Sequence, residues 1–308
     1  MSGRGKGGTP RPGLPTQAVY LLDRISTGDI KRDRDLAERL LAFHWQYYTE
    51  LAFQRWQARD EIRTALHEAA RDRFEFKAWQ RVVRYKWSLA PLSSAGSLTD
   101  PGGRFNFGDI DRPRFPAFPA LYLAEDKEIA LQESLAQSPS NVVKQAGVEL
   151  TALDMALAKP DSVLFASVSG LLDSYVDLSD PHRLQPLLEV IRGFKVSGEV
   201  RRMARSLKLP PPGIISRLDQ LKQELLKADW RAYPIQVDAP SNSQIFGQMV
   251  KEAGIDGIVF PSKFGEGRCL ALFPELLANS DSFAQLDDQP PDTRVVRRLD
   301  WTTWKLLV

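Results

Sequence analysis

Residues 120–134 read ALYLAEDKEIALQES. The run Leu121–Ala124 is apolar and of strand length, and residues 127–137 follow it with the apolar spacing of a helix. Short apolar runs alternate with such helical segments along much of the chain, and this order predicts an α+β domain.

Glu133 is the most informative residue of this stretch. At 100° per residue it lies between Ile129, Ala130 and Ala136, in a sector of the helix that is otherwise apolar. A half-buried carboxylate costs free energy unless a partner or a catalytic task compensates for it. Two interpretations stay open: a catalytic carboxylate, or an edge glutamate that reaches solvent or pairs with an arginine.

Upstream, residues 101–108 read PGGRFNFG. A glycine pair lets the backbone approach a ligand closely, and Arg104 directly after it presents a planar guanidinium suited to a phosphate. The alternative is a tight turn with a solvated arginine. It stays open because an isolated glycine-rich segment is a weak signal of phosphate binding.

Downstream, residues 257–262 read GIVFPS, so that an apolar strand runs into a proline and the hydroxyl of Ser262. Catalytic groups often lie at strand ends, although serine after proline is also ordinary turn chemistry. The chain has no G-x-S-x-G motif, no phosphate-binding G-x-x-x-x-G-K and no kinase H-R-D, so a serine hydrolase, a P-loop protein and a kinase are not expected.

The other elements follow from the same periodicities. Further strands are predicted at residues 79–85, 148–153, 163–168, 235–237, 255–260 and 269–273, with an edge strand at 294–299. Helices are predicted at residues 184–207 and 214–228, separated by the breaker at 210–213. There is no internal repeat.

The N-terminal part differs from the rest. Asp35 and Glu38 form a capping-box pattern that starts a helical region extending to about residue 71, as one helix or two. Its many aromatic residues predict packing on more than one side, with base stacking as the alternative. Residues 1–15 are glycine, proline and basic residues and predict a disordered basic leader.

Composition excludes several classes of protein. The 308 residues carry 41 basic and 39 acidic side chains, and the net charge of +2 gives no overall attraction for nucleic acid or an anionic membrane. Cys269 is the one cysteine, and the three histidines lie far apart, so neither a disulfide nor a structural metal site is expected. No apolar run reaches membrane-spanning length. We expect a soluble, cytoplasmic protein.

Four stretches resemble the RES-domain family, which is named for Arg, Glu and Ser and consists of NAD-degrading toxins from bacterial toxin–antitoxin pairs. They are WQRVVR with Arg81, GGRFN with Arg104, ALYLAEDKEIALQES with Tyr122 and Glu133, and SQIFGQMVKEAGIDGIVFPS ending on Ser262. The resemblance covers about residues 79–280. It implies an ADP-ribosyltransferase-like fold with a split, strongly curved sheet whose cleft holds NAD.

The resemblance also implies roles for individual residues. Arg104 and Arg81 would bind the diphosphate of NAD, and Tyr122 would pack against the nicotinamide or its ribose. Ser262 would form hydrogen bonds inside the cleft, and Asn106 of the GGRFN stretch would also contact NAD. Glu133 would be the catalytic carboxylate, assisted by Arg104 and Tyr122. NAD enters as a substrate, and no metal is implied.

The expected organisation follows from these pieces. It comprises the leader at residues 1–15, a helical region at 16–77, the RES domain at 78–280 with a helical insertion at about 173–230, and a linker and tail at 281–308. The proline-rich span between Arg104 and Tyr122 is also longer than the compact family pattern.

The leading functional expectation is an NAD-consuming toxin that passes ADP-ribose to phosphate or water. The alternatives are an ADP-ribosyltransferase that modifies a protein or nucleic acid, and a non-enzymatic partner-binding or nucleic-acid-binding protein. The family habit implies an antitoxin that blocks the cleft. Membrane binding and direct binding of nucleic acid are not expected, and a homo-oligomer is left open.

Overall fold

The computed structural model describes residues 27–84, 87–99, 101–111, 113–136, 163–290 and 292–308. The predicted leader at 1–15 and the predicted strand at 148–153 lie outside these residues. Helices are α1 (Thr27–Gln57), α2 (Arg59–Ala69), α3 (Lys127–Ala136), α6 (Gln185–Ile191), α7 (Gly198–Ser206), α8 (Leu218–Leu225), α9 (Ala232–Val237) and α10 (Asn242–Glu252). Strands are β1 (Arg71–Arg84), β2 (Leu121–Ala124), β3 (Val163–Asp177), β4 (Gly257–Pro261), β5 (Arg268–Leu272), β6 (Phe283–Leu286) and β7 (Arg298–Leu299). Short 3-10 turns are η3 (Ala95–Leu98), η5 (Pro181–Leu184), η6 (Pro274–Asn279) and η7 (Trp304–Leu306).

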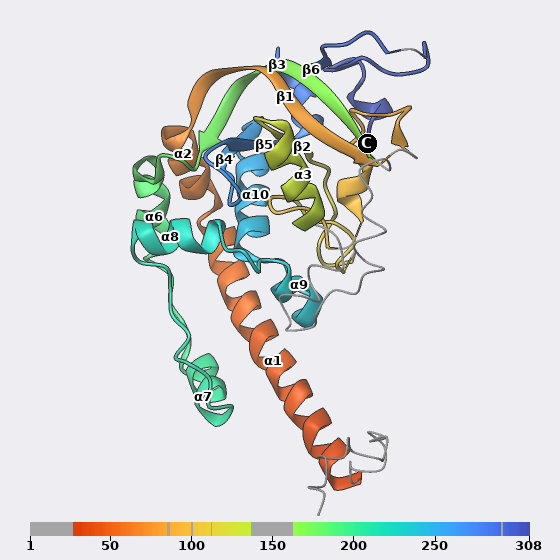
Figure 1. Cartoon of the computed structure of the whole chain (residues 1–308). Helices are drawn as coiled ribbons and strands as arrows, with labels where there is room; N and C mark the ends of the chain where they lie inside the picture. Colours follow the sequence, from red (N-terminus) through yellow and green to blue (C-terminus); the bar gives the residue numbers. More distant parts are fainter. Residues whose placement is uncertain (1–26, 85–86, 100, 112, 137–162, 291) are drawn as a thin grey trace, which may run out of the picture.

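One mixed sheet forms the centre of the molecule. Its strand order is β1-β2-β5-β4-β3-β6-β7, and β1 also pairs with β3, so that five strands close into a ring. The pairs are antiparallel except for β3 with β4. The long strands β1 and β3 run together as a curved pair over the top of the molecule (Figure 1). The predicted α+β class with a strongly curved sheet is confirmed.

The curvature has a local cause in β1. The register between β1 and β3 shifts between Phe76 and Trp79, where Ala78 has a positive φ of 56°. The backbone N–H of Ala78 is bonded to the hydroxyl of Ser169 at 3.0 Å instead of to a strand carbonyl. Such a bulge bends a strand and increases its twist, and beyond it β1 pairs with β2 at Gln80 while it stays paired with β3 as far as Arg84.

The sheet separates two apolar cores. On one face, helices α2, α6, α8 and α10 pack over side chains such as Phe260 and Ala271. On the other face, β1 and β3 enclose a second core that includes Trp79, Leu121 and Leu270. Alternation along each strand therefore decides which core a side chain joins.

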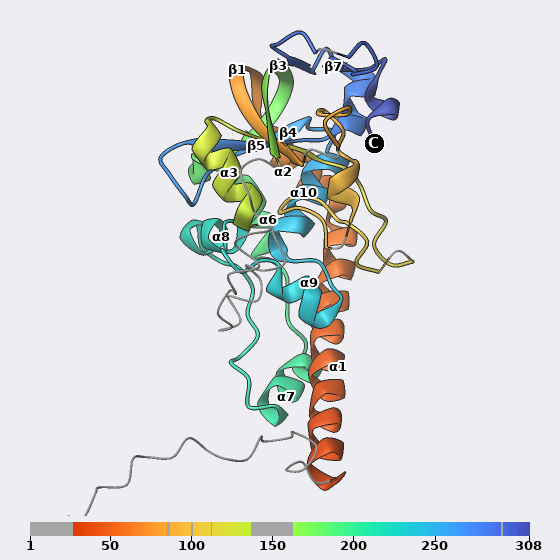
Figure 2. The same ribbon diagram turned by 45° about the vertical axis from the view of Figure 1, so that its right-hand side comes forward.

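Helix α1 extends well beyond both cores. Phe43 on α1 packs with Val196, Val200 and Ala204 around α7, and these residues form a third, separate cluster. Figure 2 shows α7 beside α1, away from the sheet. We call α1 and α7 with this cluster the arm. Within the part of the chain that the structure describes, no helix is long and apolar enough to cross a membrane.

Most predicted elements are present. The N-terminal helical region forms two helices that meet at Ala58, and residues 127–136 form α3. The predicted strands at 79–85, 121–124, 163–168, 255–260 and 269–273 correspond to β1 to β5. Helices α6, α7 and α8 lie inside the predicted insertion, although its first residues, 173–177, still belong to β3.

Four predictions of elements were wrong. Helix α1 begins at Thr27, so Asp35 and Glu38 lie inside the helix instead of capping its start. Residues 235–237 belong to helix α9, where Pro234 sits in the first turn and Ile235 is exposed. The helix predicted at 184–207 is interrupted between α6 and α7 at residues 192–197. Strand β1 begins at Arg71, eight residues earlier than predicted, because Phe74 and Phe76 alternate with charged residues and point into the second core.

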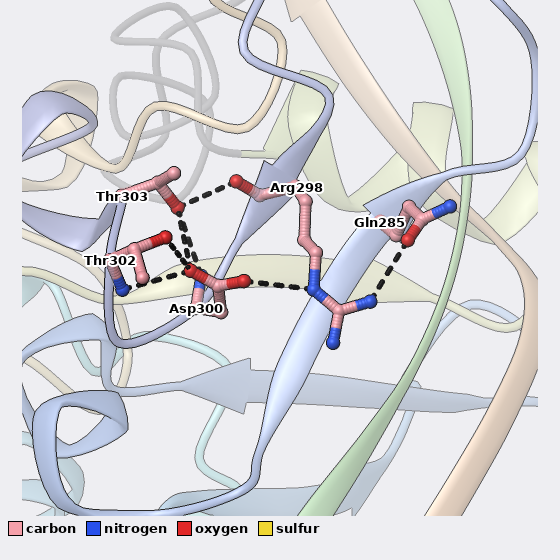
Figure 3. Close-up of polar contacts among 5 residues, drawn as sticks. All are labelled: Gln285, Arg298, Asp300, Thr302 and Thr303. Atoms are coloured by element: carbon pink, nitrogen blue, oxygen red, sulfur yellow. Dashed lines mark hydrogen bonds and ion pairs between the residues drawn. The ribbon is translucent and has the colours of Figure 1, made fainter.

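The C-terminal residues are part of the sheet. Strand β6 pairs with β3 and β7, and Leu299 and Leu307 are buried in the second core. The predicted edge strand at 294–299 is thus reduced to Arg298–Leu299. Figure 3 shows how Asp300 anchors the following turn: its carboxylate accepts from Arg298 Nε at 2.9 Å, from the backbone N–H of Thr302 at 2.9 Å and from the Thr302 hydroxyl at 2.6 Å.

Candidate functional site

The loop at residues 101–108 is built around the side chain of Asn106. Its Oδ1 accepts from the backbone N–H of Gly103 and from the Tyr122 hydroxyl, both at 2.9 Å. Its Nδ2 donates to the carbonyls of Ser97 at 2.8 Å and Phe118 at 2.9 Å. Asn106 is completely buried, and both ends of its amide are engaged within the protein. Asn106 therefore holds the loop that carries Arg104, and its contact with NAD stays a prediction.

The two glycines of the loop also serve the protein itself. Gly102 has a φ of +93°, and a Cβ there would lie 2.3 Å from Gly108 N. A Cβ on Gly103 would lie 2.3 Å from the hydroxyl oxygen of Tyr122. The sequence suggested that these glycines allow close approach of a ligand. In the structure they allow close approach of the loop to itself and to Tyr122.

Helix α10 fixes the loop from the other side. Gln244 Nε2 donates to the carbonyls of Pro101 at 2.7 Å, Gly103 at 3.2 Å and Asn106 at 3.1 Å. Gly247, one turn further, lets the helix touch the backbone of Phe105, since a Cβ there would lie 1.9 Å from Phe105 O. The stretch SQIFGQ thus positions Arg104 through its loop.

Tyr122 comes from β2, on the same face of the sheet as the first core. Its hydroxyl accepts from the backbone N–H of Phe105 at 2.9 Å while it donates to Asn106. Burial raises the pKa of Tyr122 well above its ordinary value. The phenol therefore stays neutral and braces the loop at residues 101–108.

Arg104 is buried, with 7% of its surface exposed. Its Nη1 donates to the carbonyl of Lys227 at 2.8 Å, and its guanidinium lies 5.9 Å from the ring centre of Trp230. Burial lowers the pKa of Arg104, while the negative charge of Glu133 opposes that shift. The Arg104 guanidinium therefore lies inside the molecule, where water screens its attraction to Glu133 only weakly.

Glu133 projects from α3 towards the end of β4. Its Oε1 accepts from the hydroxyl of Ser262 at 3.1 Å, and the Sγ of buried Cys269 lies 4.0 Å from the same oxygen. Ser262 is itself held, because its hydroxyl accepts from the backbone N–H of Phe264 at 3.1 Å. Burial, together with the charge of Glu133, raises the pKa of the Cys269 thiol. The thiol is therefore neutral beside the carboxylate.

Two further cations face this group. Burial lowers the pKa of Arg231 to about 10, and its guanidinium stacks 4.7 Å from the ring centre of Trp230. Lys263, just after Ser262, donates to the carbonyl of Ala228 at 3.1 Å. Burial and the positive charge of Arg104 lower the pKa of Lys263 to about 8, against the pull of Glu133. One carboxylate thus stands among three cationic side chains.

Arg81 is not brought to this group. Gln80 of β1 pairs with Ala124 of β2, so its side chain lies on the face of the sheet that carries Ala124 and Tyr122. Arg81, the next residue, therefore points to the opposite face. Its Nη2 donates to the carbonyl of Ser93 at 2.5 Å, and burial lowers its pKa to about 10. Of the predicted site residues, the structure brings together Arg104, Tyr122, Glu133 and Ser262, with Asn106 behind them.

Sequence reasoning missed Trp230, Arg231 and Lys263. Trp230 and Arg231 lie at the end of the segment predicted as a helical insertion, and no local pattern distinguishes them from surface residues. Lys263 had a usable signal. It directly follows Ser262, which was already a candidate site residue at the end of a predicted strand.

The chemistry open to this group is electrostatic. A fixed carboxylate can stabilise a cation that develops on a bound molecule, and buried guanidinium groups can hold a phosphate or diphosphate. Among the residues described, no group of three or more His, Cys, Asp or Glu side chains could hold a metal ion.

Comparison with known proteins identifies a family for the chain. The sequence model of a family described as the RES domain matches residues 77–294, more than half of the chain. No curated protein matches the chain. A solved structure described as the crystal structure of the M. tuberculosis MbcT-MbcA toxin-antitoxin complex is similar, with 14% sequence identity and a TM-score of 0.37; the likeness covers 80% of this chain and 96% of that chain.

Proposed function

The chain belongs to the RES-domain family, and from this premise we propose that it is an NAD-consuming toxin. It cleaves the bond between nicotinamide and ribose in NAD+ and transfers ADP-ribose to phosphate or water. The observation that carries the proposal is the Glu133 carboxylate, which is oriented by the Ser262 hydroxyl at 3.1 Å beside the buried Arg104.

The reaction needs a fixed negative charge. When the bond between C1′ and the pyridinium nitrogen breaks, its electron pair leaves with the nitrogen, and the ribose becomes an oxocarbenium-like cation. Glu133 stabilises that cation more strongly than it stabilises the ground state, which is the requirement for lowering the barrier. Nicotinamide leaves as a neutral molecule, so no acid has to protonate it. An unprotonated oxygen of phosphate then bonds to C1′ directly, whereas a water that bonds to C1′ passes a proton to solvent.

Arg104 holds the anionic part of the substrate in this proposal. Its guanidinium is already desolvated, so a diphosphate oxygen would meet a donor that is fixed and poorly hydrated. Tyr122 bounds the same space and braces the loop that carries Arg104. NAD is then consumed as a substrate rather than retained.

A direct test follows nicotinamide release when the full chain is incubated with NAD+ and phosphate. Replacing the carboxylate by an uncharged isostere, Glu133→Gln, should reduce the rate at least about 100-fold, because one preorganised electrostatic group contributes that much in comparable sites. A wild-type rate no greater than that of Glu133→Gln would overturn the proposal. Label passing from NAD to a protein or nucleic acid, with little ADP-ribose or its phosphate in solution, would identify a macromolecular acceptor instead.

We also propose a partner. Family membership supports an antitoxin that blocks the site, and unpaired expression of the chain should then stop growth. Co-expression with the product of a neighbouring gene should restore growth, while Glu133→Gln should be harmless on its own. Equal growth with wild-type and Glu133→Gln chains expressed alone would contradict this proposal.

A further inference from the structure

Two cations of the site point at one short stretch of backbone. Arg104 Nη1 donates to the carbonyl of Lys227 at 2.8 Å, and Lys263 Nζ donates to the next carbonyl, that of Ala228, at 3.1 Å. The two cations come from different parts of the chain, the loop at residues 101–108 and the end of β4. Because both cations donate to successive carbonyl oxygens, they mark one place in the site where two neighbouring oxygen atoms are bound.

Residues 227–231, which we call the cap, run between α8 and α9 and cover this position. Trp230 of the cap is buried, with the guanidinium groups of Arg231 and Arg104 lying 4.7 Å and 5.9 Å from its ring centre. The side chains of Lys227 and Asp229 remain half exposed. The cap thus presents its carbonyls, its indole and the Arg231 guanidinium to the site, and the side chains of Lys227 and Asp229 to solvent.

Neutral carbonyls are weak partners for such cations. A phosphate oxygen carries a negative charge, so it adds an attraction between opposite charges that a neutral carbonyl does not supply. Two cations that hold adjacent oxygens suit a ligand whose anionic oxygens are also adjacent, and a diphosphate has that geometry. An arriving diphosphate would therefore compete with the two carbonyls for the same donors.

We propose that Arg104 and Lys263 form a diphosphate-binding pair, that the Lys227 and Ala228 carbonyls occupy it in the structure described here, and that the cap moves when the anion binds. The inference rests on the proposed function and extends it, because it adds Lys263 to the substrate site and makes opening of the cap a condition of binding. It concerns binding alone and contains no chemical step.

The test uses the full chain and inorganic diphosphate, which has no nicotinamide bond to cleave. Affinity is measured by calorimetry, and hydrogen exchange is followed in peptides covering residues 226–232. Lys263→Gln is the informative variant, since it keeps a polar side chain but loses the charge. Lys222→Gln on α8 is the matched control, because Lys222 takes no part in these contacts. Circular dichroism and thermal melting check that both variants fold.

For the wild-type chain we expect diphosphate to bind and to speed hydrogen exchange in the cap. Lys263→Gln should weaken diphosphate binding about tenfold, the effect of losing one charge-assisted hydrogen bond, and Lys222→Gln should not. Equal diphosphate affinity of wild type and Lys263→Gln, or unchanged exchange of the cap in saturating diphosphate, would overturn the inference.

These outcomes are separable from those of the proposed function. If diphosphate opens the cap through Lys263 but NAD+ is not cleaved, the inference stands and the proposed function fails. If nicotinamide release depends on Glu133 while Lys263→Gln binds diphosphate normally, the function stands and the inference fails.

Discussion

The hydroxyl of Ser262 can donate one hydrogen bond, and the Glu133 carboxylate accepts it. Because the same oxygen accepts from the backbone N–H of Phe264, rotation of the hydroxyl is restricted, and the donated hydrogen bond fixes one oxygen of the carboxylate. Ser262 thus acts on the reaction through the position of Glu133, which makes it a positioning residue in the proposed mechanism.

Ser262→Ala should therefore lower kcat for NAD+ cleavage by roughly tenfold and change KM little, because one hydrogen bond to a charged group is lost while the cations remain. Steady-state nicotinamide release measures both constants. Ser262→Thr keeps the hydroxyl and should recover most of the rate. A rise in KM at constant kcat would instead mean that Ser262 contacts the substrate.

The charge of Lys263 should make binding depend on pH. Its pKa is lowered to about 8, first by burial and then by Arg104 and Arg231, while Glu133 and Asp229 oppose the shift. Since the protonated form binds the anion, the charge is present below pH 8 and is lost above it. KM for NAD+ should therefore rise as the pH passes from about 7 to 9.

Lys263→Arg supplies the control for this titration, because a guanidinium stays charged throughout that range. Its KM should remain level where that of the wild-type chain rises. Parallel profiles for the two chains would show that another group causes the change.

At this scale, the sequence identified the residues that meet but not their orientation. Arg104, Glu133 and Ser262 were predictable because each stands out from an apolar or glycine-rich context. Asn106 in such a loop could serve a ligand or the loop, and only its hydrogen bonds identify its role. Arg81 could lie on either face of its strand, because the pairing of β1 with β2 was not known beforehand.

Among the elements, the two long strands and the C-terminal segment depend on one another. Strand β3 pairs with β1 along almost its whole length and also with β6, which in turn holds β7. The turn after β7 is fixed by Asp300, whose side chain is largely buried. The C-terminal segment therefore contributes to the stability of the sheet although it extends past the region that the family model matches.

Asp300→Ala should lower the free energy of unfolding by about 1–3 kcal/mol, because the donors from Arg298 and Thr302 lose their acceptor. Urea denaturation followed by circular dichroism measures the change. Asp292→Ala is the control, since Asp292 forms a similar pair with Arg294 two residues away on an exposed loop. Equal destabilisation by the two substitutions would contradict the structural role of Asp300.

The elements that prediction missed share a cause. The alternation of Phe74 and Phe76 with charged residues was short and directly followed a strong helical pattern, so the start of β1 was hidden. Residues 235–237 are apolar and of strand length, yet they continue a helical turn that begins at Ala232, and a window of three residues cannot distinguish the two.

For the whole molecule, the important division is between the two cores that enclose the sheet and the cluster that forms the arm. The residues of the arm cluster belong to neither core. The site lies between α3, α10 and the sheet, so its geometry depends on the cores and not on the packing of α7.

Phe43→Ala should therefore loosen α7 without impairing catalysis. Removing the largest side chain of the small arm cluster leaves a cavity that α7 cannot fill, and such truncations cost about 3–5 kcal/mol of local stability. Hydrogen exchange in residues 198–206 should become much faster, while nicotinamide release stays within about twofold of wild type. Leu36→Ala, at an exposed position of the same helix, should change neither. A large loss of activity in Phe43→Ala would link the arm to the site.

The burial of Leu299 and Leu307 in the second core has a consequence for the order of events during synthesis. Strands β2 and β5 carry Tyr122 and Cys269 on one face and lean on that core with the other. A ribosome completes the segments of β2, β3 and β5 before it adds these two leucines, so the second core stays incomplete until they are made. The packing behind the site therefore includes residues that are made after those of the site itself, and a nascent chain that stops short of residue 299 lacks part of the second core.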